Sequence, residues 1–447
     1  MTKDTRRRGT LLQRLGLSLL SLLAIVAADR LLKVYYYSKT YRYYEAGEVY
    51  VEDENTLLLF SPDRYLFWKI KPRIELKITE DPEEYDLRTI GSRPGHYFFT
   101  VRSNAHGLNS PDVSRSKPAG TRRVITLGDS RTMAEGVPFD RLYSRRLEAL
   151  LHERLPATPV EVINAGVSGY TSYQGLVQLK RNLLAFDPDV VTVLFGINDQ
   201  DFDLGVSDRH RAEAFDSPMV TVRAWANRSM IYYFMRRQAW QLKGLLFGKT
   251  RLGPPGSGAG DEIVRRVSTE EYRANLEEIA DFGEIHGFTP VFLILPTSPY
   301  AYYPSLFDES LEDVRLAHLA KFQRALQHYE GQDYGTAVEL LTEILAERDY
   351  AHVRRLLGQS YQQLQRYEEA HEQFVEMNRK IIFQRYAEVV RQVSRERGLP
   401  LVDLTPEFTA ITPEPLYVDD MHPNPRGQDL IAAKTAEAIL SKGLLAP

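Results

Sequence analysis

The chain has 447 residues, of which 43% are hydrophobic and 26% are charged, and its formal net charge is -4 at pH 7. This composition is typical of a globular protein, and the length allows a catalytic domain with further segments. The small negative net charge gives no support to nucleic-acid binding, and the absence of cysteine excludes disulfides, thiolate metal sites and a cysteine nucleophile.

The beginning of the chain favours a membrane anchor. A basic cluster precedes an apolar core at residues 15–28, and the apolar stretch extends over residues 11–34 if its charged side chains snorkel to the interfaces. Several tyrosines follow at 35–44, as expected at the headgroup level. We therefore expect a cytoplasmic tail at 1–10 followed by one transmembrane helix. A signal peptide cleaved after Ala28 is the alternative.

Five short apolar runs predict the strands of a parallel sheet. They follow a polar segment, residues 35–120, whose short alternating runs indicate an irregular, partly β lead-in. Uniformly apolar, β-branched runs suit strands buried on both faces, and helical patterns separate them, which predicts a doubly wound α/β fold with a parallel five-stranded sheet. The runs are VITL (124–127), VEVINAG (160–166), VVTVLFG (190–196), VFLILP (291–296) and LVDL (401–404).

Two of the predicted helices carry signals for their ends. Ser268 and Glu271 have the spacing of a capping box, and Gly287 is placed to stop the same helix. Asn424 is expected to cap the last helix, with Pro425 at its first position.

A helical segment at 310–380 interrupts the alternation of strands and helices, so the α/β domain is expected to comprise residues 121–309 and 381–447. Its pattern is typical of tetratricopeptide repeats, which predicts a docking insertion for a protein partner. A helical hairpin without a ligand is the alternative. The pattern consists of Tyr334, Ala337 and Leu341, their counterparts Tyr367, Ala370 and Phe374, and the group Leu357, Gly358 and Tyr361.

Polar residues stand where the predicted strands end. Ser130 follows the first strand, Gly166 ends the second, and Asn198 follows the third. The carboxyl ends of parallel strands meet at one edge, where ligands bind. A nucleophilic serine needs a base with an orienting acceptor, and His422 with Asp419 three residues earlier can provide both. The N–H groups of Ser130 and Gly166 and the amide of Asn198 would then donate to an oxyanion.

Four blocks in this order resemble those of the SGNH/GDSL hydrolase family. The segment NAHGLNSPDVSRSKPAGTRRVITLGDS (104–130) also resembles the lead-in of its membrane-anchored bacterial members. The resemblance spans roughly residues 121–300 and 385–447. It implies a flavodoxin-like sheet and a Ser-His-Asp esterase or acyl transferase without a cofactor or metal. The blocks are GDS with Ser130, NAGVSGYTS with Gly166, FGIND with Asn198, and DDMH with Asp419 and His422.

Three residues beside these blocks carry expectations of their own. Arg131 departs from the apolar or hydroxyl residue that many relatives have after the serine, and we expect it to tune the acyl or glycan pocket. Asp129 is expected to support the turn around Ser130, and Asp199 the loop of Asn198. Asp420 is the alternative to Asp419 as the partner of the histidine.

The expected function is that of an enzyme anchored in the bacterial inner membrane, with its catalytic domain in the periplasm. Its substrate would be an O-acyl or O-acetyl ester of an envelope glycan, and a secreted form would follow from signal cleavage. The alternative is an envelope assembly protein that uses tetratricopeptide-like helices and the hydrolase fold only for binding. A complete set of serine, histidine and aspartate argues against a pure scaffold.

Overall fold

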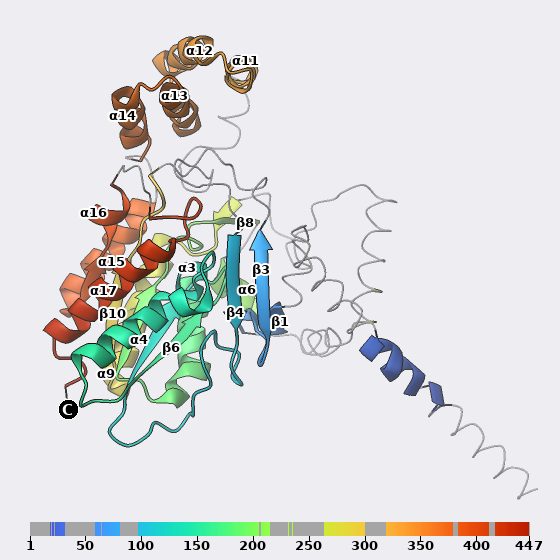
Figure 1. Ribbon diagram of the computed structural model, residues 1–447, viewed down its shortest axis with the longest axis vertical. Helices are drawn as coiled ribbons and strands as arrows, with labels where there is room; N and C mark the ends of the chain where they lie inside the picture. The colour runs from blue at the N-terminus through green and yellow to red at the C-terminus, as the bar shows by residue number, and fades with distance from the viewer. Residues whose placement is uncertain are drawn as a thin grey trace, which may run out of the picture.

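A parallel five-stranded sheet forms the centre of the protein (Figure 1). Its order is β11-β10-β7-β5-β6, which is 2-1-3-4-5 in chain order, as in flavodoxin-like folds. The five predicted strands are confirmed: β5 Arg122–Gly128, β6 Val160–Gly166, β7 Val190–Leu194, β10 Thr289–Ile294 and β11 Leu401–Asp403. The computed structural model describes residues 18, 20–21, 23–31, 59–63, 65–80, 97–204, 207–214, 231, 235, 263–299, 319–378, 383–410 and 416–446.

Helices cover both faces of the sheet, which explains why its strands are apolar at successive positions. On one face, Val124 and Val162 pack in a cluster with residues of α4 (Tyr143–Arg154) and α17 (Pro425–Ser441). On the other face, Ile125 joins a larger cluster, which includes residues of three helices that cover this face. Because alternate residues of a strand point to opposite faces, this pattern confirms the doubly wound fold. The three helices are α5 Ser172–Gln178, α9 Thr269–His286 and α15 Phe383–Arg397.

The predicted helix ends are confirmed. Ser268 and Glu271 form both bonds of a capping box at the start of α9, and Gly287 ends the helix with a φ of 79°. At the start of α17 the Asn424 side chain accepts from the N–H of Gly427, and Pro425 is the first helical residue.

The lead-in contains two antiparallel hairpins. Strand β1 (Phe60–Asp63) pairs with β2 (Phe67–Ile70), and β3 (Glu75–Glu80) pairs with β4 (Tyr97–Arg102). Further short elements are the helical turns α3 Ser130–Met133, η1 Phe139–Arg141, η2 Leu179–Leu183, η3 Leu184–Phe186, α6 Asp208–Ala214 and α16 Thr405–Phe408, and the pair β8 Phe202–Leu204 and β9 Ile263–Arg265.

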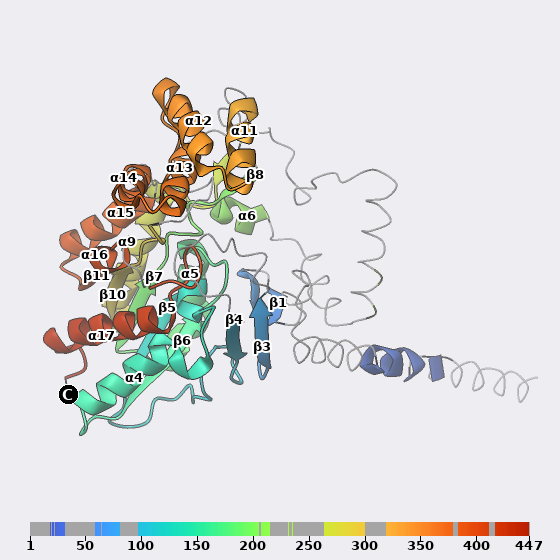
Figure 2. The same ribbon diagram turned by 45° about the horizontal axis from the view of Figure 1, so that its top comes forward.

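Four consecutive helices occupy the segment where a helical insertion is predicted, and they lie together in both views (Figures 1 and 2). Gly358 lies against the ring of Phe374, where a Cβ atom would come within 2.9 Å, so glycine permits the close contact of the last two helices. The assignment to tetratricopeptide repeats stays a prediction. The helices are α11 Leu319–Glu330, α12 Tyr334–Glu347, α13 Ala351–Gln363 and α14 Tyr367–Asn378.

The predicted tail at 1–10 and half of the predicted anchor at 11–34 lie outside the described residues. Among the residues that are described, no helix is both long and apolar enough to span a bilayer. The anchor stays a prediction.

The buried carboxyl group of Asp199 holds the loop after β7 against α5. One oxygen accepts from the N–H and the hydroxyl of Ser172, at 2.9 and 2.5 Å, and the other accepts from the N–H of Gly196 at 2.9 Å. Asn275 of α9 donates to the same hydroxyl at 2.9 Å. Burial raises the pKa of Asp199 to about 7, against the effect of the donors from Ser172 and Gly196.

This raised pKa makes stability depend on pH. The ordinary pKa of an aspartate is 3.8, so between about pH 4 and 7 the folded state holds a proton that the unfolded state has lost. The free energy of unfolding therefore falls as the pH rises through this window, and it levels off above it.

We predict that Asp199→Asn removes this contribution. The free energy of unfolding of the wild type minus that of the variant should fall by up to about 1.4 kcal/mol per pH unit between about pH 5 and 7. Urea unfolding followed by circular dichroism measures it. Asp187→Asn is the control, because the Asp187 side chain is 70% exposed. A difference that stays constant with pH for Asp199→Asn would contradict the prediction.

Candidate active site

The turn after β5 places Ser130 at the beginning of α3. Gly128 is required there for steric reasons, since a Cβ atom would come within 2.1 Å of the Thr132 hydroxyl and 2.6 Å of the Leu194 carbonyl oxygen. Asp129 caps α3 by accepting from the N–H of Arg131 at 2.9 Å. The run Gly-Asp-Ser thus ends the strand with a close contact, a cap and a hydroxyl group at the carboxyl edge of the sheet.

Arg131 does not border a pocket, and the expectation that it tunes one is wrong. Its side chain is fully buried and forms an ion pair with Asp129, which is also fully buried, with 2.8 Å between Nη2 and Oδ2. Its Nη1 donates to the carbonyl oxygen of Leu295 at 2.8 Å, and its guanidinium lies 5.7 Å from the ring centre of Phe383. The expected supporting role of Asp129 is confirmed by the same contacts.

The structure brings together the serine, the histidine and the aspartate. The Nε2 atom of His422 lies 2.8 Å from the Oγ atom of Ser130, although 292 positions separate the two residues. The Nδ1 atom of His422 lies 2.6 Å from Oδ2 of Asp419. Asp419, not Asp420, is therefore the partner of the imidazole.

The second oxygen of Asp419 fixes the loop on which the histidine stands. It accepts from the backbone N–H groups of Met421 and His422, both at 2.7 Å. Burial alone would raise the pKa of the Asp419 carboxyl, but the charge of His422 and these hydrogen bonds outweigh burial and lower it. The carboxyl group is thus held in its ionised form beside Nδ1.

The loop of Asp419 and His422 is anchored to the end of β10. The hydroxyl of Tyr417 donates to the carbonyl oxygen of Pro296 at 2.6 Å. The N–H of Ser298 donates to the carbonyl oxygen of Asp420 at 2.8 Å. Because β10 belongs to the same sheet as β5, one rigid edge holds both the serine and the histidine.

The N–H group of Gly166 does not have the predicted role of binding an oxyanion. It donates a hydrogen bond to Oδ1 of Asn164 at 2.9 Å. A Cβ atom at Gly166 would come within 2.2 Å of the Met133 nitrogen, so its glycine is explained by the contact of β6 with α3. We therefore correct the prediction that Gly166 is an oxyanion donor.

Other N–H groups are better candidates for binding the oxyanion. In the described part of the chain, the N–H groups of Ser130 and Gly169 have no hydrogen-bond acceptor. The side-chain amide of Asn198 donates to the carbonyl oxygen of Tyr170, the residue after Gly169, at 3.0 Å. An amide nitrogen has two N–H groups, so one remains for a ligand.

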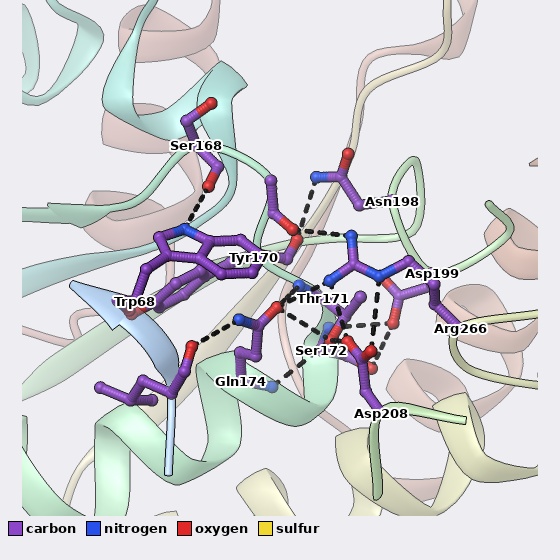
Figure 3. A network of polar contacts seen from close by, with 12 residues as sticks. Trp68, Ser168, Tyr170, Thr171, Ser172, Gln174, Asn198, Asp199, Asp208 and Arg266 are labelled. Atoms are coloured by element: carbon purple, nitrogen blue, oxygen red, sulfur yellow. Dashed lines mark hydrogen bonds and ion pairs between the residues drawn. The ribbon is translucent and has the colours of Figure 1, made fainter. Parts of the chain in front are cut away.

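Segments outside the four sequence blocks position the loop of Gly169 (Figure 3). The indole N–H of Trp68 in β2 donates to the Ser168 carbonyl oxygen at 3.0 Å. Arg266 donates to the carbonyl oxygen of Gly169 at 2.9 Å and to the carboxylate of Asp208, also at 2.9 Å. The lead-in and the segment after β9 therefore both contribute to the site.

Sequence reasoning missed several residues of this site. Gly169 lies inside the quoted block NAGVSGYTS, where a second glycine was a signal, and its φ is 75°. Trp68 and Arg266 had no such signal, because only the fold brings their segments to the site. Glu135, five residues after the serine, was also missed, and its carboxylate lies 3.5 Å from Nε2 of His422.

Part of the chain matches the model of a known protein family. Residues 126–331 match the model of the GDSL-like Lipase/Acylhydrolase family, a range that includes Ser130 and ends before Asp419 and His422. No match is found among curated proteins.

Three of the solved structures that are similar to this chain are LAE5, Axe2 and TesA. LAE5, an alpha/beta hydrolase enzyme from the metagenome of Lake Arreo, Spain, is 18% identical, with a TM-score of 0.34 over 75% of this chain and 100% of that one. Axe2, an acetylxylan esterase from Geobacillus stearothermophilus, is 15% identical, with a TM-score of 0.34 over 72% and 95%. TesA is 15% identical, with a TM-score of 0.35 over 72% and 99%.

The matched range begins near the end of β5 and includes the turn that carries Ser130, and this serine contacts His422. The protein is an ester-hydrolysing serine hydrolase, and its residues 126–331 are similar to the GDSL-like Lipase/Acylhydrolase family.

Proposed function

We propose that the protein removes or transfers an O-acyl group, in particular an O-acetyl group, of an envelope glycan, with Ser130, His422 and Asp419 as its catalytic triad. The observation that carries the proposal is the continuous contact from Oγ of Ser130 through the imidazole to the carboxylate, at 2.8 and 2.6 Å. The choice of an envelope glycan rests on the resemblance of the four sequence blocks.

The geometry supports the following reaction. Oγ of Ser130 attacks the ester carbonyl carbon while Nε2 of His422 takes the hydroxyl proton. Asp419 accepts a hydrogen bond from the Nδ1–H group and stabilises the imidazolium that forms. When the tetrahedral intermediate collapses, Nε2 gives its proton to the leaving alcohol oxygen, and the acyl group stays on Ser130. Water, or an acceptor hydroxyl, then attacks the acyl group with His422 again as the base, which restores the serine.

Three donors are proposed for the oxyanion: the N–H groups of Ser130 and Gly169 and the second N–H of Asn198. A negative charge develops on the carbonyl oxygen only in the transition state and the intermediate, so fixed donors lower the barrier without reorganisation. The contacts of Trp68 and Arg266 with the loop of Gly169 support its fixed position.

A scaffold function is the second candidate, and it draws on the helices α11–α14. None of the triad or oxyanion residues lies on these helices, which favours docking of a protein partner over a part in the chemistry. The contact between Ser130 and His422 favours an enzyme that also docks over a scaffold alone.

We predict that Ser130→Ala lowers hydrolysis of p-nitrophenyl acetate by at least about 10³-fold, because no other group replaces the nucleophile. The variant should also lose covalent labelling by a fluorophosphonate, read by mass spectrometry. Ser441→Ala is the control, since Ser441 is an exposed serine at the end of α17. Activity of Ser130→Ala within tenfold of the wild type would overturn the assignment.

We predict that Asn198→Ala lowers kcat by about 10²- to 10³-fold with a much smaller change in KM. Asn198→Asp, which keeps the size but removes both N–H groups, should lose at least as much. Steady-state kinetics with p-nitrophenyl acetate measure the two constants. If the variants mainly raise KM, Asn198 contributes to ground-state binding and is not an oxyanion donor.

We also propose that residues 11–34 anchor the enzyme in the bacterial inner membrane, with Ser130 on the periplasmic side. The basic start, the apolar core and the tyrosines that follow support this orientation.

After cell fractionation, we expect the full-length chain in the membrane fraction even after a carbonate wash. A membrane-impermeant fluorophosphonate should label Ser130 in spheroplasts. A soluble periplasmic protein that begins near Asp29 would show a cleaved signal peptide instead.

A further inference from the structure

Glu135 is held next to the proposed nucleophile by a constrained turn. Helix α3 ends at Met133, and the N–H groups of Ala134 and Glu135 both donate to the carbonyl oxygen of Ser130, at 2.8 and 3.2 Å. Two positive φ angles flank the glutamate, 64° at Ala134 and 86° at Gly136. The position of Glu135 is therefore tied directly to the backbone of Ser130.

The conformation of Ala134 indicates that the surroundings enforce this turn. A non-glycine residue in the left-handed region is strained and persists only where neighbouring structure over-determines it, which is most often at functional sites. Ala134 is 1% exposed and packs with Val137 and Leu142. The packed core thus fixes the place from which the Glu135 side chain extends.

The carboxylate of Glu135 faces the atom that handles the proton. Its Oε2 lies 3.5 Å from Nε2 of His422, and its side chain is 18% exposed. Within the described part of the chain, the imidazole of His422 is the one group that forms an ion pair with this carboxylate, and it does so when it is protonated. In the proposed reaction Nε2 delivers its proton to the leaving oxygen, so the leaving alcohol must come close to Glu135.

We propose that Glu135 selects the leaving alcohol of the ester: an uncharged alcohol with a second hydroxyl group next to the ester oxygen, as in a sugar or another polyol. This inference rests on the proposed function and names the substrate class on the side of the alcohol. The carboxylate accepts a hydrogen bond from the neighbouring hydroxyl and repels an alcohol that carries a negative charge. Glu135 takes no part in the proton transfer, since the proton passes only between Ser130, His422 and the leaving oxygen.

Two matched pairs of esters test the selection. The first is methyl 4-acetoxybenzoate against 4-acetoxybenzoate, which differ in the charge of the leaving group. The second is glycerol 1-acetate against propyl acetate, which differ in the neighbouring hydroxyl. The ratio of kcat/KM within each pair is compared between variants, so a general loss of activity cancels.

We expect the wild type to prefer the neutral ester and the glycerol ester. In Glu135→Gln the preference for the neutral ester should fall about tenfold, the size of a like-charge repulsion in a partly exposed site. In Glu135→Ala the preference for glycerol 1-acetate should fall by a similar factor, because the acceptor is lost. Glu153→Gln is the control, since Glu153 is exposed on α4 and should leave both ratios unchanged.

Two results would overturn the inference. One is a pair of ratios that stay the same in the Glu135 variants. The other is a wild-type preference for the neutral ester that is no greater than the preference in hydroxide-catalysed hydrolysis. This measurement uses the wild type alone, so it remains informative if the variants fail to fold. Neither result bears on Ser130→Ala, whose retained activity would instead refute the proposed triad.

Discussion

The buried ion pair between Asp129 and Arg131 is the interaction on which the site depends. Its two residues flank Ser130 in the sequence, and both side chains are fully buried. Through its bond to the Leu295 carbonyl oxygen, the guanidinium also connects the end of β5 to the end of β10, from which Pro296 and Ser298 hold the loop of His422. Loss of one partner would leave an uncompensated charge in the core, which costs several kcal/mol. The serine and the histidine are therefore placed by one shared support.

The fold and the three reacting side chains could be predicted from the sequence because each depends on a local rule. Buried parallel strands must be apolar on both faces, and the polar residues that follow them must meet at one edge, which predicts the place of Ser130. His422 follows from the need of a serine nucleophile for a base with an acceptor beside it, which Asp419 provides three residues earlier. The capping roles of Asn424 and Ser268 could also be predicted, because a capping residue interacts only with its own helix.

The differences arise where a role depends on the direction of a group. Sequence places Arg131 next to the serine, but only packing turns its side chain inward to Asp129. Gly166 has the expected place at the end of β6, yet its N–H points to Asn164 and its lack of a side chain serves the contact with Met133. Trp68 lies far from the blocks in sequence, so no pattern predicted its bond to the loop of Gly169.

The helical insertion is connected to this same edge at both ends. Before it, Ser298 donates to the carbonyl oxygen of Asp420 in the histidine loop. After it, Phe383 at the start of α15 lies near the guanidinium of Arg131 and against Gly196, where a Cβ atom would come within 3.0 Å of the ring. A shift of either connection would disturb the histidine loop or the ion pair that flanks Ser130. The docking proposed for α11–α14 and the proposed catalysis would therefore share structural elements, even though no reacting residue lies on those helices.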